Sequence, residues 1–403
     1  MTVRRFDEIE GGITSVPGFL ASGVCAGIKR QDRADIALIY SREEAVAAAT
    51  YTTNRVVAAP VTITRDRLKA GRMQAVIVNS GNANACTGRR GYRDAIEMTR
   101  RVADRLKLDV NRVGIASTGV IGQVLPMEKI RKVLPEAVDR LSSEGGGDAA
   151  LAMMTTDTFP KEVAVRGRVG GRWVTVGGVA KGSGMIHPRM ATMLAFIGTD
   201  MDIHLPPLRK MIKEVVKQTF NRVTVDGDTS TNDMVLCMAN RLSGNPVTPS
   251  AYRQFSGMLR HVADRLAKMI VMDGEGATKF IEIRVKGAKS IRDAERAGFA
   301  TANSSLVKTM FFGEDPNWGR IMAALGYSGA FLREDRIKIT FDKVRVVARG
   351  MGLGKDREME ARKVMKQREF TLTIDLGVGR GEATVWTSDL SYDYVKINVG
   401  YRS

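Results

Sequence analysis

The chain has 403 residues, and its 44% hydrophobic and 26% charged content is that of a globular protein with a substantial core, which excludes bulk disorder. Lys and Arg outnumber Asp and Glu by 62 to 44, a formal net charge of +18. The basic residues are scattered and aromatic residues make up only 6%, so we favour a basic surface that attracts anionic substrates over a nucleic-acid groove.

The first half of the chain mixes β-rich runs with amphipathic helices. A helix capped by Asp94 and another opened by Pro126 carry apolar residues at helical spacing. The SSEGGGD stretch at 142–148 is typical of a loop. Short strands, the last two joined by a GRVGGR hairpin, are expected at Val56–Thr64, Ala75–Asn79, Val113–Ser117, Glu162–Arg166 and Trp173–Gly177.

The second half continues the mixture without strict strand-helix alternation. Two helices with clear apolar stripes are expected at Pro206–Phe220 and Ser250–Ile270. Further strands are expected at Phe280–Val285, Ile337–Phe341, Phe370–Asp375 and Ala383–Thr387. This order predicts an α/β protein with layered sheets and antiparallel content, not a doubly wound nucleotide-binding sheet.

Histidine and metal chemistry have few candidates in this sequence. The chain has three histidines, of which His261 lies off a helical apolar stripe, His204 belongs to a helix-entry turn and His187 stands on a Pro-flanked loop. A Ser/His/Asp catalytic triad therefore has no convincing histidine to act as its general base. No HExxH motif or His/Cys cluster occurs, so no metal site is predicted.

The cysteines and the hydropathy pattern indicate a reducing cytoplasm. Cys25, Cys86 and Cys237 are odd in number and form no CxxC pair, and Cys86 is interpreted as a small buried residue. The N-terminal stretch lacks the apolar core of a signal peptide. No apolar run reaches the roughly 18 residues that a membrane-spanning helix needs.

The most unusual segment is KGSGMIHPRMATMLAFIGTD at 181–200, where a Gly-Ser-Gly loop leads to Thr192 and an apolar run. Thr192 has an ordinary interpretation as a β-branched strand residue. In a chain with few histidines, however, a threonine hydroxyl can be activated by the threonine's own α-amine. That amine becomes available only if the peptide bond after Ala191 is cut, which the hydroxyl can begin by attacking the Ala191 carbonyl.

Ten segments, in order over nearly the full length, resemble the glutamate N-acetyltransferases, also called ornithine acetyltransferases, of the cyclic arginine pathway. They are GFLASGVCAGIK at 18–29, NSGNANACTG at 79–88, STGVIG at 117–122, MTTDTFPK at 154–161, KGSGMI at 181–186, MATML at 190–194, FNRVTVDGDTSTND at 220–233, DGEGATK at 273–279, DPNWGR at 315–320 and YVKINVGYRS at 394–403.

This resemblance implies a layered αββα fold reminiscent of N-terminal nucleophile hydrolases, with a smaller C-terminal α/β lobe. We expect a catalytic core over 1–280 and a lobe over 281–403 whose tail returns to the active site. It further implies self-cleavage between Ala191 and Thr192, giving fragments that pair as an α2β2 heterotetramer. The family usually has Pro-Asn-Met-Ala-Thr at this point, whereas Arg189 here adds a positive charge beside the cleavage site.

The resemblance also assigns roles to individual residues. Thr192 is the nucleophile, and Thr118 with Gly119 forms the oxyanion hole, although Ser-Thr-Gly also suits an ordinary strand-to-loop turn. Lys181 suits a substrate α-carboxylate and Glu275 the ornithine ammonium group, in loops where both residues are ordinarily solvated. The implied substrate-binding residues are Thr155, Lys181, Thr192, Glu275, Asn398 and Ser403, with Thr155 chosen over its neighbour Thr156.

The expected reaction moves the acetyl group of N2-acetyl-L-ornithine to Thr192 and then to L-glutamate. No cofactor is expected, and the sequence does not decide whether acetyl-CoA is a second donor. The alternatives are a related self-processing aminopeptidase or amidohydrolase and, more distantly, a basic nucleic-acid-binding protein. The DGDTSTND segment at 226–233 lacks EF-hand spacing and is interpreted as a hydrogen-bonded structural turn.

Overall fold

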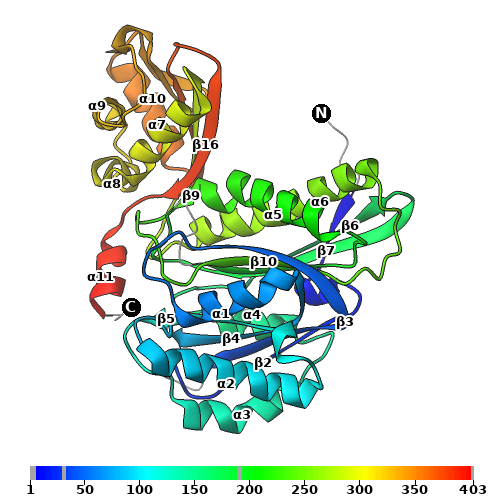
Figure 1. Cartoon of the computed structure of the whole chain (residues 1–403). Coiled ribbons are helices and arrows are strands. Elements are labelled where there is room, and N and C mark those ends of the chain that lie inside the picture. The colour runs from blue at the N-terminus through cyan, green and yellow to red at the C-terminus, as the bar shows by residue number, and fades with distance from the viewer. Residues whose placement is uncertain (1–5, 30–32, 188–192, 401–403) are drawn as a thin grey trace. The chain divides into compact units, whose positions relative to one another are not determined.

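The computed structural model describes residues 6–29, 33–187 and 193–400. Contacts within the chain define two compact units, and Figure 1 shows the whole chain. The first unit comprises Met1–Asn221 and Asp228–Ile270, and the second comprises Arg222–Gly227 and Val271–Arg402. Within the described ranges, no helix has the length and apolar character needed to cross a membrane.

A nine-stranded sheet forms the centre of the first unit, in the order β1-β6-β7-β8-β10-β3-β4-β5, with β2 also paired to β3. Most neighbours are antiparallel, whereas β8 with β10 and β4 with β5 are parallel. The strands are β1 (Phe6–Ile9), β2 (Phe19–Val24), β3 (Ile36–Tyr51), β4 (Arg72–Asn82), β5 (Val113–Val120), β6 (Lys161–Val169), β7 (Arg172–Lys181), β8 (Leu194–Thr199) and β10 (Met234–Ala239).

Strand β3 belongs to both halves of this sheet. Its first part pairs with β2 and its last part with β10, and its pairing with β4 shifts register between Tyr40 and Ala45. Such an irregularity bends a strand. Side chains from both halves, including Phe19 of β2 and Phe196 of β8, belong to one buried cluster, together with residues of α4 (Gly146–Met153). The two halves therefore face each other across a shared core.

Helices cover the outer faces of the two sheet halves (Figure 1). On one side, α1 (Ala59–Arg67), α2 (Gly88–Leu106) and α3 (Met127–Asp139) contribute to a buried cluster with β2, β3, β4 and β5. On the other, α6 (Pro249–Met272) lies against β7, and α5 (Leu205–Gln218) lies against β3. The resulting layers run helix, strand, strand, helix, which confirms the predicted α/β sandwich.

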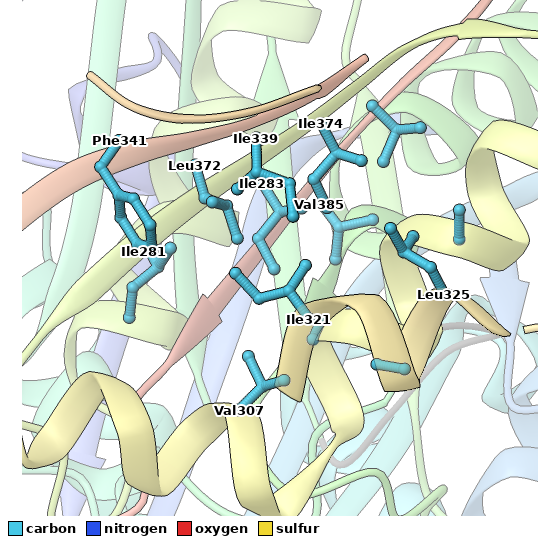
Figure 2. Packing of buried hydrophobic residues seen from close by; sticks show 14 of the residues in the cluster. Ile281, Ile283, Val307, Ile321, Leu325, Ile339, Phe341, Leu372, Ile374 and Val385 are labelled. Carbon is cyan, nitrogen blue, oxygen red and sulfur yellow. The ribbon is translucent and has the colours of Figure 1, made fainter. Parts of the chain in front are cut away.

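The second unit is built on a seven-stranded sheet in the order β14-β13-β12-β15-β11-β16-β9. Its core joins Ile283 and Val385 of the sheet to Ile321 and Leu325 of α9, as Figure 2 shows. The elements are β9 (Val223–Thr224), β11 (Phe280–Ala288), α7 (Ile291–Asn303), α8 (Ser305–Phe312), α9 (Trp318–Gly326), β12 (Lys338–Phe341), β13 (Val344–Ala348), β14 (Met351–Gly352), α10 (Lys355–Met365), β15 (Glu369–Asp375), β16 (Gly381–Ser388) and α11 (Tyr392–Gly400).

Three local predictions were wrong. The strand expected at Val56–Thr64 is instead the helix α1, whose Pro60 occupies the first turn, where a missing N–H costs nothing. Asp94 lies inside α2, which begins at Gly88. The loop expected at 142–148 gives way at Gly146 to α4, a short helix with buried alanines that packs on the sheet.

Candidate active site

The site lies in the first unit, where β7 ends and β8 and β10 begin. Lys181 is the last residue of β7 and pairs with Leu194, the first residue of β8. Leu194 in turn pairs with Met234, the first residue of β10. The register therefore sets these three residues in one row across the sheet.

The Lys181 ammonium group contacts two of the other residues assigned by resemblance, Thr155 and Thr118. The residue is 2% exposed, and its Nζ donates a hydrogen bond to Thr155 Oγ1 at 2.8 Å and to Thr118 Oγ1 at 3.3 Å. Thr118 lies on β5 and Thr155 follows α4, so the contacts connect segments distant in sequence. Of the neighbouring threonines, Thr155 contacts the lysine, whereas the Thr156 hydroxyl pairs with Ser183 Oγ at 2.7 Å.

Asp157 holds this cluster together. Its buried carboxylate accepts hydrogen bonds from Lys161 Nζ at 2.8 Å, from the Gly182 N–H at 2.7 Å and from the Thr155 N–H at 2.9 Å. Lys181 Nζ lies 3.7 Å from Asp157 Oδ2. Burial alone would raise the pKa of this carboxyl, but Lys181 and Lys161 outweigh burial and hold the pKa well below its ordinary value. Asp157 is therefore ionised and balances two buried ammonium groups.

Thr118 and Gly119, the pair predicted for the oxyanion hole, lie near the end of β5, where the backbone leaves room only for glycine. Gly119 has a φ of 128°, and a Cβ on it would lie 2.4 Å from the backbone carbon of Gly81 and 2.5 Å from the nitrogen of Asn82. Only glycine fits there, because backbone atoms cannot move aside. The strand register pairs Thr118 with Ser80 and Gly119 with Gly81, which fixes this end of β5 against β4.

Two residues of the 230–233 segment reach the same strand ends and were not predicted as site residues. Asn232 Nδ2 donates to the carbonyl oxygens of Ser117 at 2.9 Å and Ala83 at 2.6 Å. Asp233 Oδ1 accepts the Met193 N–H at 2.9 Å. The sequence signal was the Ser/Thr/Asn/Asp-rich stretch itself, which only indicated turn hydrogen bonding. The structure adds that these bonds hold the end of β5 that carries Thr118 and Gly119, and the start of β8.

Lys29 is a further cation that the sequence did not single out. Its Nζ donates to the carbonyl oxygens of Met154 at 2.7 Å and Ala152 at 3.3 Å. Burial lowers the pKa of Lys29 to about 8, and the field of Lys181 acts in the same direction, while Asp35 and Asp157 oppose it. Lys29 and Lys181 therefore both place ammonium groups near Thr155, with Asp157 and Asp35 as their acidic neighbours.

The remaining predicted residues divide into two groups. Glu275 and Asn398 belong to the second unit, where Asn398 Nδ2 donates to Glu275 Oε2 at 2.8 Å. Ala191, Thr192 and Ser403 lie outside the described residues.

The structure also shows the surroundings of Cys86, His204 and His261, the other residues considered for chemistry in the sequence. Cys86 is exposed at a positive φ of 57°, not buried as predicted, because the tight NANACTG turn leaves its side chain outside the core. His204 immediately precedes α5, as expected, and His261 Nε2 pairs with Glu8 at 2.6 Å. Within the described ranges, no group of three or more His, Cys, Asp or Glu side chains is arranged to hold a metal ion.

Comparison with known proteins assigns the chain to a family. The family model described as the ArgJ family matches residues 20–403. The chain belongs to the ArgJ family. It is 51% identical over 400 residues to the arginine biosynthesis bifunctional protein ArgJ of Symbiobacterium thermophilum, covering 98% of this chain and 99% of that protein. With the protein of the same name from Geobacter sulfurreducens the identity is 52% over 392 residues, covering 96% and 100%.

Among solved structures, an ornithine acetyltransferase from Mycobacterium tuberculosis, complexed with ornithine, is 41% identical to this chain. The match covers 45% of this chain and 98% of that one, with a TM-score of 0.43.

Proposed function

We propose that this chain transfers the acetyl group of N2-acetyl-L-ornithine to L-glutamate, giving L-ornithine and N-acetylglutamate in arginine biosynthesis. The observation that carries the proposal is the buried cluster of Lys181, Thr118 and Thr155 in a member of the ArgJ family. Both amino-acid substrates carry an α-carboxylate, and this cluster offers an ammonium group beside two hydroxyl groups as hydrogen-bond donors. The proposed compartment is the cytoplasm.

The proposed nucleophile is Thr192, freed by self-cleavage after Ala191. Its hydroxyl attacks the acetyl carbonyl while its α-amine, with an ordinary pKa of roughly 7.7–8, accepts the hydroxyl proton. Thr118 and Gly119 donate to the oxygen of the tetrahedral intermediate. The amine returns the proton to the departing ornithine nitrogen, and glutamate then takes the acetyl group by the reverse steps. Glu275, Asn398 and Ser403 complete the proposed substrate site.

Thr192→Ala tests the nucleophile. Without the hydroxyl neither ester can form, so we expect a single full-length chain with no detectable transfer. Thr192→Ser is the matched control, because it keeps a hydroxyl nucleophile and should still give two fragments and measurable transfer. Electrophoresis and a coupled ornithine assay read out both properties. Two fragments from the alanine variant, or normal transfer by it, would contradict the proposal.

The covalent intermediate and its acceptor separate a transferase from a hydrolase. Mature protein incubated with acetylornithine should gain one acetyl group on the fragment that begins at Thr192, as mass spectrometry will show. Ornithine release should depend on glutamate with ping-pong kinetics. Release that ignores glutamate would instead indicate a hydrolase. Glutamate acetylation with acetyl-CoA alone decides whether the protein has two donors, and gel filtration tests the proposed α2β2 assembly.

A further inference from the structure

Asp233 is a buried carboxyl group that the proposed transfer reaction does not use. It is 0% exposed and immediately precedes β10. One oxygen, Oδ1, accepts the Met193 N–H at 2.9 Å. The other, Oδ2, is buried and accepts no hydrogen bond from the described part of the chain. The hydroxyl of Thr52 lies beside Asp233 and acts to lower the pKa of Asp233, while it donates to the Ser230 carbonyl oxygen at 2.6 Å.

A buried carboxyl oxygen without a donor is costly, because its lost hydration is not replaced. Such an oxygen in a native core calls for a functional explanation. Burial raises the pKa of Asp233 well above its ordinary value, and the field of Lys181 on β7 opposes that rise. The group is therefore both a stronger base and a better proton donor near neutral pH than an exposed aspartate.

The position of Asp233 is set by the backbone of the nucleophile segment. Its Oδ1 bonds the N–H of Met193, the residue joined by a peptide bond to Thr192. Thr192 is thus the immediate chain neighbour of a residue whose backbone N–H this carboxyl group binds. Before cleavage Thr192 has no free α-amine, so the base that serves turnover is not yet available.

Resting on the proposed role of Thr192, we propose that Asp233 is the proton-transfer group of the self-cleavage step. Asp233 Oδ2 accepts the proton of the Thr192 hydroxyl as its oxygen bonds to the Ala191 carbonyl carbon. The same proton passes to the Thr192 nitrogen as the carbon–nitrogen bond breaks. The product is an ester between Ala191 and Thr192, which water hydrolyses to the Ala191 carboxylate and the free Thr192 amine.

Asp233→Asn tests this role with little change in shape. The asparagine oxygen can still accept the Met193 N–H, but the amide nitrogen cannot accept a proton, so cleavage should slow by about a hundredfold or more. The matched control is Asp200→Asn, since Asp200 is also buried, accepts a strand N–H, from Thr175 at 2.7 Å, and lies at the opposite end of β8. This control should cleave at the wild-type rate.

The assay follows newly synthesised full-length chains by electrophoresis, with and without hydroxylamine, which cuts esters. Slow Asp233→Asn cleavage that hydroxylamine does not accelerate supports the proposal, because the block then precedes the ester. An unchanged rate, or an ester that accumulates and is cut by hydroxylamine, overturns it. Cleavage blocked by Lys181→Met but not by Asp233→Asn would assign the base to Lys181. If the wild type itself stays whole, the proposed function fails instead.

The wild-type chain provides a test that needs no variant to fold. Because the ionised carboxylate is the base, the cleavage rate of fresh wild-type precursor should rise with pH as Asp233 loses its proton and should level off once the carboxyl group is ionised. A rate that stays constant as pH rises would overturn the proposal even if Asp233→Asn proved unstable.

Discussion

Two buried aspartates at neighbouring strand ends have opposite electrostatic character. Asp157 is surrounded by Lys161, Lys181 and backbone N–H donors, and its pKa is well below the ordinary value. Asp233 is as deeply buried, but only its Oδ1 has a hydrogen-bond donor in the described part of the chain, and its pKa is well above the ordinary value. Burial thus fixes the cost of ionisation, while the neighbouring donors decide whether that cost is met.

The difference suggests separate uses for the two carboxyl groups. A permanently ionised Asp157 suits a structural role, because it fixes two lysines and the start of the glycine loop after β7. A carboxyl group whose pKa is raised by burial, such as Asp233, holds a proton more readily than an exposed aspartate and suits proton transfer. Substitutions at the two places should therefore produce different kinds of defect.

The largest expected effect is on folding at Asp157. Asp157→Ala leaves the Lys161 and Lys181 charges buried without their partner, which should lower the free energy of unfolding by about 3–5 kcal/mol. Urea titration of intact chains, with Thr192→Ala in the background to prevent cleavage, measures this loss. Asp139→Ala is the control, since it breaks an exposed pair with Arg105 and should cost less than about 1 kcal/mol. Equal losses would show that pairing in the core does not matter.

A smaller effect is expected at Asn232, the residue before Asp233. Asn232→Ala removes the donor to the Ser117 and Ala83 carbonyl oxygens beside Thr118 and Gly119, the proposed oxyanion hole. Transition-state stabilisation should weaken by about 1–3 kcal/mol, so kcat should fall roughly tenfold to a hundredfold with little change in KM. Asn240→Ala is the control, because its buried amide bonds the Pro17 carbonyl oxygen beyond the other end of β10. A comparable fall in kcat for Asn240→Ala would contradict a specific positioning role for Asn232.

A further expected effect concerns the pH dependence of stability at Asp200. Burial raises the pKa of Asp200 to about 6. Because the folded state binds this proton more tightly than the unfolded chain does, the group's contribution is fully present at low pH and is lost as pH rises from about 4 to about 6. The loss is on the order of 2–3 kcal/mol. Asp200→Asn should therefore be more stable than the wild type at neutral pH.

Unfolding curves at several pH values measure this difference directly. The stability gap between Asp200→Asn and the wild type should widen as pH rises through that window and then stay constant. A gap that does not change with pH would mean that Asp200 does not titrate there. That result would also weaken the view that burial without a cationic partner sets the behaviour of Asp233.

Local patterns determined much of the fold. The apolar stripes of α5 and α6 and the β-rich runs of β6, β7 and β11 were predicted close to their observed bounds, because each pattern records the burial of one face. The long strand β3 was missed. Its AVAAAT stretch is rich in alanine, which favours helix locally, and pairing with β4 and β10 overrides that preference.

The sequence by itself determined the family through ordered blocks, and it predicted Thr192 as the nucleophile in a chain with few histidines. Only the tertiary structure decided that Lys181 meets Thr118 and Thr155, that Asp157 is ionised and that Asp233 is buried with an unpaired oxygen. The physical reason is the distance along the chain over which each kind of information acts. Periodicity reports which face of an element is buried, whereas the charge of a buried group depends on donors that strand register brings from distant segments.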